Sequence, residues 1–135
     1  MAVYSDSEQL LEIMRSLFAR VEAEYPAAGD AVSASHLVIL IRCTRPDADV
    51  LINGRKRPPE IWYGPGGMRP TLTIETATDT LHEIMLGELS LKRALAQGAL
   101  KVRGPVHRIT VLADLFYALQ KVYPDLVKEP GHPLS

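Results

Sequence analysis

The C-terminal part of the chain contains a predicted helix with far more apolar side chains than a surface helix needs. Its polar residues form one narrow stripe at spacings of three and four, made of His107, Thr110, Asp114, Tyr117 and Lys121. The remaining residues are largely apolar, namely Val106, Ile109, Val111, Leu112, Leu115, Phe116, Ala118, Leu119 and Val122. A surface helix buries an apolar stripe only about 100° wide. The surplus predicts a second packing partner besides a sheet: another subunit, a neighbouring helix or a ligand in a cavity.

The N-terminal segment carries the signals of a second amphipathic helix. Residues 5–8, Ser-Asp-Ser-Glu, have the pattern of a capping box with Ser5 as the N-cap. Apolar residues then recur at helical spacing to about Tyr25. We expect Pro26 and the loop after it to end this helix.

The segments between the two helices alternate between strand and short-helix patterns. Strands are predicted within 35–42, where the apolar run covers both faces, and at 50–52, 61–63, 71–75 and 100–103. Asn53-Gly54 predicts a tight turn between the second and third strands. Two short helices ended by Gly87 and Gly98 precede the last strand. This order, with short links between the early strands, favours an α+β domain in which helices pack on an antiparallel sheet.

Composition and charge limit the function classes. A length of 135 residues with 47% hydrophobic residues predicts one globular domain over 1–135. The net charge of −1 provides no basic field, so nucleic acid is not an expected partner. The single cysteine, Cys43, indicates a reducing compartment, and its place at the end of an apolar strand predicts a buried side chain. The sequence shows neither a signal peptide nor a membrane-spanning run, so we expect a cytoplasmic location.

Four motifs from Thr71 to Leu119 resemble the sterol carrier, or non-specific lipid-transfer, protein family. They are Leu72-Thr73-Ile74, Gly87-Glu88-Leu89, Ala94-Leu95-Ala96-Gln97-Gly98 and Leu100-Lys101-Val102-Arg103-Gly104, in the family's order. Pro105 departs from the acidic residue that commonly follows the last motif. The absence of a peroxisomal signal favours a bacterial-type, stand-alone member.

The resemblance implies a five-stranded, mostly antiparallel sheet packed with helices around an apolar tunnel. It also implies a ligand such as a fatty acid, a fatty acyl thioester, a phospholipid or a sterol-like molecule, and a protein that is not an enzyme and needs no cofactor. We expect the tunnel to be lined by Trp62, Leu81, Ile84, Met85, Leu89, Leu95, Leu112, Leu115, Phe116 and Leu119. The basic residues Arg55, Lys56, Arg57 and Arg69 are expected to meet a ligand head group or, transiently, an anionic membrane surface.

Two other function classes stay open at this stage. The first is an enzyme or accessory factor that acts on a hydrophobic metabolite, for which His107 and Asp114 are the candidate residues because they share one polar stripe. No third orienting group or nucleophile lies nearby in sequence, and the four histidines show no metal-ligand spacing. The second is a dimeric interaction module that covers the surplus apolar face, whereas a carrier is expected to be a monomer or a weak dimer.

Overall fold

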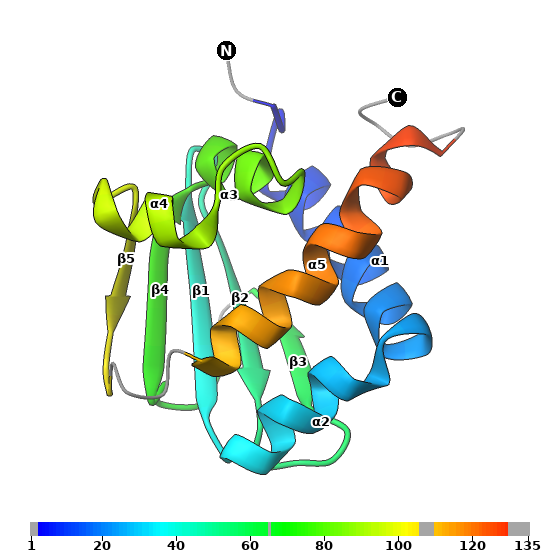
Figure 1. Cartoon of the computed structure of the whole chain (residues 1–135), viewed down its shortest axis with the longest axis vertical. Coiled ribbons are helices and arrows are strands. Elements are labelled where there is room, and N and C mark those ends of the chain that lie inside the picture. The colour runs from blue at the N-terminus through cyan, green and yellow to red at the C-terminus, as the bar shows by residue number, and fades with distance from the viewer. Residues whose placement is uncertain (1–2, 65, 106–109, 130–135) are drawn as a thin grey trace.

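The computed structural model describes residues 3–64, 66–105 and 110–129, and it forms a five-stranded sheet with helices packed on one face (Figure 1). The strands are β1 (Val38–Thr44), β2 (Ala48–Asn53), β3 (Glu60–Tyr63), β4 (Leu72–Ala77) and β5 (Leu100–Arg103). Their order across the sheet is β3-β2-β1-β4-β5. The β1–β4 pair is parallel and the other three pairs are antiparallel. The predicted α+β fold with a five-stranded, mostly antiparallel sheet is therefore confirmed.

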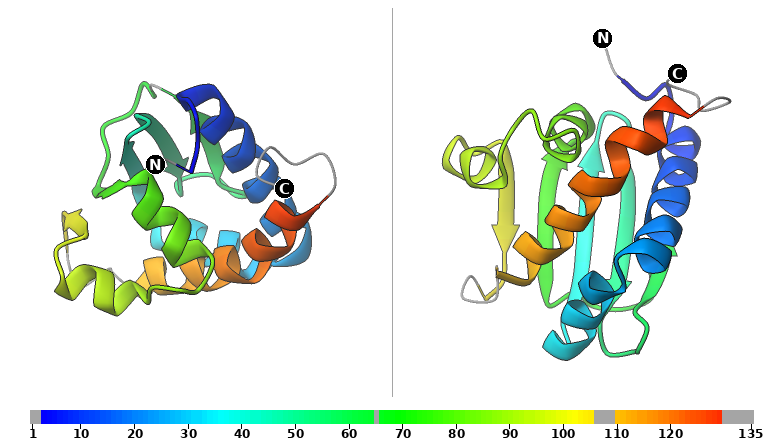
Figure 2. Two further views of the ribbon diagram at one scale, coloured as in Figure 1. Left: turned by 90° about the horizontal axis from the view of Figure 1, so that it is seen from above. Right: turned by 45° about the vertical axis from the view of Figure 1, so that its right-hand side comes forward.

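Both faces of β1 are buried, as its continuous apolar run predicts for a central strand. Ile39 and Ile41 face the helices and belong to the main core. Val38 and Leu40 face the other side, where they pack with Leu51 of β2 against the loop that carries residue 68. Figure 2 shows the helices together on one side of the sheet, so the main core lies between the two layers.

The helices are α1 (Ser7–Glu24), α2 (Pro26–Ser35), α3 (Thr78–Met85), α4 (Leu91–Ala96) and α5 (Thr110–Lys128). The predicted N-cap of α1 is wrong by one residue. Asp6 is the cap, and its carboxylate accepts a hydrogen bond from the Gln9 backbone N–H at 2.8 Å. The Gln9 side-chain oxygen in turn accepts from the Ser5 backbone N–H at 2.8 Å. A carboxylate is the stronger acceptor at the positive end of the helix dipole, which favours Asp6 over the Ser5 hydroxyl.

Of the two predicted chain breaks, one is wrong and the other is present. Pro26 does not lead into a loop but begins α2, because a proline at the first helical position needs no N–H partner. The turn predicted at Asn53-Gly54 follows β2 directly, and residues 54–59 connect β2 to β3. Gly54 is required there by close packing: a Cβ on it would lie 2.5 Å from the carbonyl oxygen of Leu37.

The surplus apolar surface of α5 is covered by neighbouring helices. The helix crosses the helix layer diagonally and contacts α1, α2 and α3 (Figure 1). Its buried residues are Leu112, Leu115, Phe116, Ala118, Leu119, Val122, Tyr123 and Leu126. Thr110, Asp114, Tyr117 and Lys121 are exposed, as the polar stripe predicts, whereas His107 lies outside the described residues. Neighbouring helices, one of the three predicted partners of the surplus face, thus cover the buried residues of α5.

Candidate functional site

The structure brings most of the predicted tunnel residues together, but as packed core. Seven of them are at most 3% exposed and lie on α3 and α5, namely Leu81, Ile84, Met85, Leu112, Leu115, Phe116 and Leu119. Leu89 and Leu95 are half-buried at the margin of the same cluster. Trp62 lies apart from the others, because it is 37% exposed on β3. Its ring is next to Gly67 in the loop after the strand, where an added Cβ would contact the ring at 3.6 Å.

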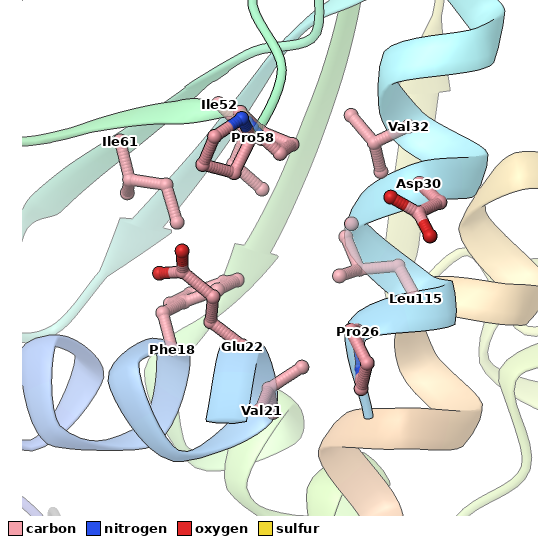
Figure 3. Close-up of a pocket in the computed structure, with 12 residues that line it drawn as sticks. Phe18, Val21, Glu22, Pro26, Asp30, Val32, Ile52, Pro58, Ile61 and Leu115 are labelled. Atoms are coloured by element: carbon pink, nitrogen blue, oxygen red, sulfur yellow. The ribbon is translucent and has the colours of Figure 1, made fainter. Parts of the chain in front are cut away.

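An apolar pocket lies beside this cluster, between the C-terminal half of α1, the helix α2 and the edge of the sheet (Figure 3). Its volume is about 230 Å³. The lining consists of Phe18, Val21, Glu22, Pro26, Gly29, Asp30, Val32, Ile52, Pro58, Pro59, Ile61 and Leu115. Among the predicted tunnel residues, Leu115 of α5 is therefore the one that lines this pocket.

Helical and strand spacing explains why these side chains converge. Phe18, Val21 and Glu22 are three and four residues apart on α1, so they share one face of that helix. Pro26, Gly29 and Asp30 repeat the same spacing on α2, while residues 52 and 61 are directly paired across β2 and β3. The sequence contains these spacings, but a loop after Pro26, as predicted, would not form the wall that α2 provides.

The mouth of the pocket carries the charges. Arg57 pairs with Asp30 at 3.6 Å, and Lys56 pairs with Glu60 at 3.2 Å. Trp62 donates a hydrogen bond to the Glu60 carboxylate at 2.8 Å. This hydrogen bond lowers the pKa of Glu60, and the hydrogen bond from Lys56 lowers it further.

The four basic residues predicted to meet a head group or a membrane lie at one end of the sheet. Arg55, Lys56 and Arg57 follow Gly54, whose backbone N–H donates to the Leu37 carbonyl. Arg69 lies two residues before Thr71. The Thr71 backbone N–H donates to the carbonyl of Val38, which directly follows Leu37 and begins β1. These contacts place the two basic loops together, yet none of their four cations lines the pocket.

A second pocket, of about 450 Å³, lies at the other end of β1 and β2. An ion pair between Arg42 and Asp49, at 3.4 Å, is part of its wall. Cys43 also lines it and is 2% exposed, so the predicted burial of this side chain is confirmed. Burial raises the pKa of the Cys43 thiol to about 12, which keeps it protonated and unreactive near neutral pH.

A buried hydrogen-bonded chain, which the sequence did not reveal, joins Tyr4, Tyr123 and His82. The two hydroxyls are 2.6 Å apart, and the Tyr123 hydroxyl lies 2.5 Å from His82 Nδ1. Asp114 is exposed on the outer face of α5, so in the described part of the chain it faces neither pocket. Within that part there is no cluster of three metal-ligating side chains, and no helix is long and apolar enough to cross a membrane.

Comparison with known proteins identifies a family and a fold. A family model described as the SCP-2 sterol transfer family matches residues 18–117. A search of curated protein sequences gives no significant match. Among solved structures, the chain is similar to the sterol carrier protein domain 2 of Helicoverpa armigera, with a TM-score of 0.66 and 18% identity over 84% of this chain and 89% of that chain.

Two further solved structures show the same fold. Sterol Carrier Protein 2 from Yarrowia lipolytica, in its apo form, has a TM-score of 0.60 and 11% identity, over 82% of this chain and 89% of that chain. Palmitated SCP2L2 from Aedes aegypti has a TM-score of 0.59 and 19% identity, over 78% of this chain and 91% of that chain. At these identities the likeness concerns the arrangement of helices and strands.

Proposed function

The chain belongs to the SCP-2 sterol transfer family, and from this membership we propose that it carries an apolar ligand in the pocket between α1, α2 and the β2–β3 edge. The apolar lining of that pocket is the observation that carries the proposal. A fatty acyl chain or a sterol-like molecule is the class of ligand that such walls accept. The fatty-acyl state of the Aedes aegypti protein supports the same ligand class.

The energetics of carriage need apolar wall area and no catalytic group. Burial of one methylene is worth about 0.8 kcal/mol relative to water, so about ten methylenes contribute roughly 8 kcal/mol before ordering costs. Most of this gain cancels when the ligand leaves a bilayer, whose interior is equally apolar. We therefore expect fast exchange between membranes and the protein.

The pocket volume of about 230 Å³ lies below the ~300–1,000 Å³ typical of small-molecule sites. A long chain therefore fits once side chains at the floor move. Leu115 lines the pocket and also belongs to the core cluster that contains the predicted tunnel residues of α3 and α5. We propose that the ligand enters here and extends toward this core, so that the predicted tunnel residues contact the inner part of its chain.

Two observations favour a carrier over the dimeric module and the enzyme. Neighbouring helices cover the surplus apolar face of α5, so this face does not require a second subunit. The exposed position of Asp114 gives it no route to a substrate in the pocket. We propose a carrier rather than an enzyme for these reasons.

Blocking the pocket tests the proposal. Gly29 lines it on α2, and a Cβ there would contact Pro59 at 3.4 Å. The larger side chain of Gly29→Leu should occupy pocket space and abolish binding of Nile red, a neutral fluorescent probe, and its displacement by dodecanol. Ala34→Leu is the matched control, because Ala34 is exposed on the same helix.

Melting temperatures of both variants identify any general loss of folding. Equal Nile red binding by wild type and a folded Gly29→Leu variant would contradict this location of the site. Lack of binding by the wild type would contradict the proposed function as a whole.

A further inference from the structure

Two carboxylates stand at the mouth of the pocket, in a lining that is otherwise apolar. Glu22 comes from α1 and Asp30 from α2, and Figure 3 shows them on opposite sides of the opening. The basic loop that follows Gly54 contributes Pro58 and Pro59 to the lining, but none of its cations. The part of the protein nearest to a ligand head group is thus acidic, although the adjoining loop is basic.

The cations around this mouth already have partners. Arg57 pairs with Asp30 at 3.6 Å and Lys56 with Glu60 at 3.2 Å. Away from the pocket lining, Arg20 of α1 pairs with Glu24 of the same helix at 3.8 Å and with Glu129.

Two further cations, Arg15 and Arg55, form no ion pair among the described residues. Arg15 lies over the ring of Tyr63, 4.8 Å from its centroid. Arg55 is exposed at the start of the basic loop, without an ion pair among the described residues. Glu22 likewise has no ion-pair partner in the described part of the chain, so its charge is uncompensated at the pocket.

The charge of Glu22 acts on the β3 side of the pocket. The pKa of Tyr63 is raised to about 12, mainly by burial, and Glu22 adds to this rise while Arg15 opposes it. Glu22 and Asp30 are both exposed, so a head group at the mouth interacts with them with the modest strength of a surface charge pair. A carboxylate there would be a third negative charge beside Glu22 and Asp30, of which Asp30 is paired with Arg57, whereas an ammonium group would pair with Glu22.

We propose that this pocket prefers amphiphiles with a cationic amine head group over those with a carboxylate, and that Glu22 determines this preference. The inference rests on the proposed function, because it assigns the polar end of the ligand carried in the same pocket. The Arg57–Asp30 pair holds the second carboxylate in place and compensates its charge, which leaves Glu22 free to bind the ligand.

Three probes with the same twelve-carbon chain test the head-group preference. Dodecylamine, dodecanol and dodecanoate displace Nile red at neutral pH, below the concentrations at which they form micelles. Dodecylamine should bind about two- to fivefold more tightly than dodecanol, and dodecanoate more weakly than dodecanol, as expected for partly exposed charge pairs. The difference should shrink at high salt.

Two charge-neutralising variants assign the effect to a residue. Glu22→Gln should remove most of the preference for the amine, measured as the ratio of dodecylamine affinity to dodecanol affinity in the same variant. Glu24→Gln is the control, because Glu24 lies on the same helix, is exposed and does not line the pocket. This control should keep the wild-type order of the three probes.

The possible results separate the two proposals. Dodecanoate binding at least as tightly as dodecanol, or an unchanged preference in Glu22→Gln, would overturn the head-group inference while the carrier function stands. Failure of all three probes to bind would overturn the carrier function together with it.

Discussion

Tyr123 links three parts of the molecule through one buried hydroxyl. It is fully buried on α5 and contacts the hydroxyl of Tyr4 and the Nδ1 atom of His82. Burial raises the pKa of Tyr4 to about 12 and also raises that of Tyr123, so both phenols stay neutral. With both hydroxyls protonated, one consistent chain has Tyr4 donating to Tyr123 and Tyr123 donating to a neutral imidazole.

Removal of this hydroxyl should destabilise the fold. Tyr123→Phe keeps the ring but leaves the Tyr4 hydroxyl and His82 Nδ1 without their shared partner, at a cost of about 1–3 kcal/mol. Tyr117→Phe is the control, because Tyr117 is 59% exposed, and it should change stability by less than about 0.5 kcal/mol. Urea unfolding measures both, and equal effects would contradict the role assigned to the chain.

His82 should make stability depend on pH. Desolvation lowers its pKa below the usual value, against the opposing effects of Glu88, Asp79 and Glu83. The folded state therefore binds the proton less tightly than the unfolded state. Its stabilising contribution is complete above about pH 6.5, the unfolded pKa, and is lost as pH falls through the lower folded pKa.

His82→Gln tests this dependence, because glutamine keeps an acceptor for the Tyr123 hydroxyl but does not titrate. Between about pH 7.5 and about pH 5, the wild type should lose more unfolding free energy than this variant. Parallel pH profiles would show that His82 does not contribute.

Local sequence signals predicted single residues only where their partners are near in sequence. The capping-box pattern at residues 5–8 predicts the start of α1, but the choice between Ser5 and Asp6 as the N-cap depends on which side chain best fits the first turn. The partner of His82 is 41 residues away on α5, so no local pattern could indicate it.

At the level of elements, two glycines near the pocket have opposite roles. Gly29 lies inside α2, where a Cβ would have room beside Pro59, whereas Gly54 packs its backbone directly against two carbonyl oxygens. Glycine inside a helix costs about 0.5–1 kcal/mol relative to alanine. Alanine at position 29 therefore gains helix propensity, whereas alanine at position 54 would place its Cβ 2.5 Å from the Leu37 oxygen.

Alanine substitutions should shift stability in opposite directions at these two positions. Gly29→Ala should stabilise by up to about 1 kcal/mol, because its Cβ makes an ordinary to tight contact at 3.4 Å. Gly54→Ala should destabilise by about 1–3 kcal/mol, the typical cost of overpacking. Thermal unfolding followed by circular dichroism measures both signs. A stabilised Gly54→Ala variant would contradict the packing described here.

Strong periodicity and clear end signals explain which elements were predicted. The two-sided apolar run of β1, the alternation of β4 and the glycine ends of α3 and α4 were all confirmed. The missed element, α2, is rich in alanine and carries few apolar positions to define a stripe. Its helical state depends on contacts with α1 and α5. The pocket wall formed by α2 was therefore missed as well.

At the scale of the whole molecule, the two basic loops and the pocket mouth lie on the same part of the surface. Pro58 and Pro59 line the pocket directly after the three cations at 55–57. We propose that this loop meets an anionic membrane surface and brings the mouth to its lipid. Electrostatic attraction of this kind contributes about 1 kcal/mol for each Lys or Arg near the surface.

Neutralising the loop should weaken vesicle binding. The triple variant Arg55→Gln, Lys56→Gln, Arg57→Gln should lose up to about fivefold in affinity per charge for phosphatidylcholine vesicles that contain phosphatidylserine. Neutralisation of two exposed cations on α4, Lys92→Gln and Arg93→Gln, is the control at a distant part of the surface (Figure 1). Co-sedimentation measures both. A larger loss in the α4 variant would place the membrane contact elsewhere.

Methyl NMR with bound dodecanol tests the central claim most directly, because it locates the ligand. The pocket has methyl groups from Val21, Val32, Ile61 and Leu115, whereas Val38 and Leu40 report the opposite face of the sheet. We predict contacts between the dodecanol chain and the first four residues, with no contacts to the last two. Contacts at Val38 and Leu40, or none at saturating dodecanol, would contradict the account.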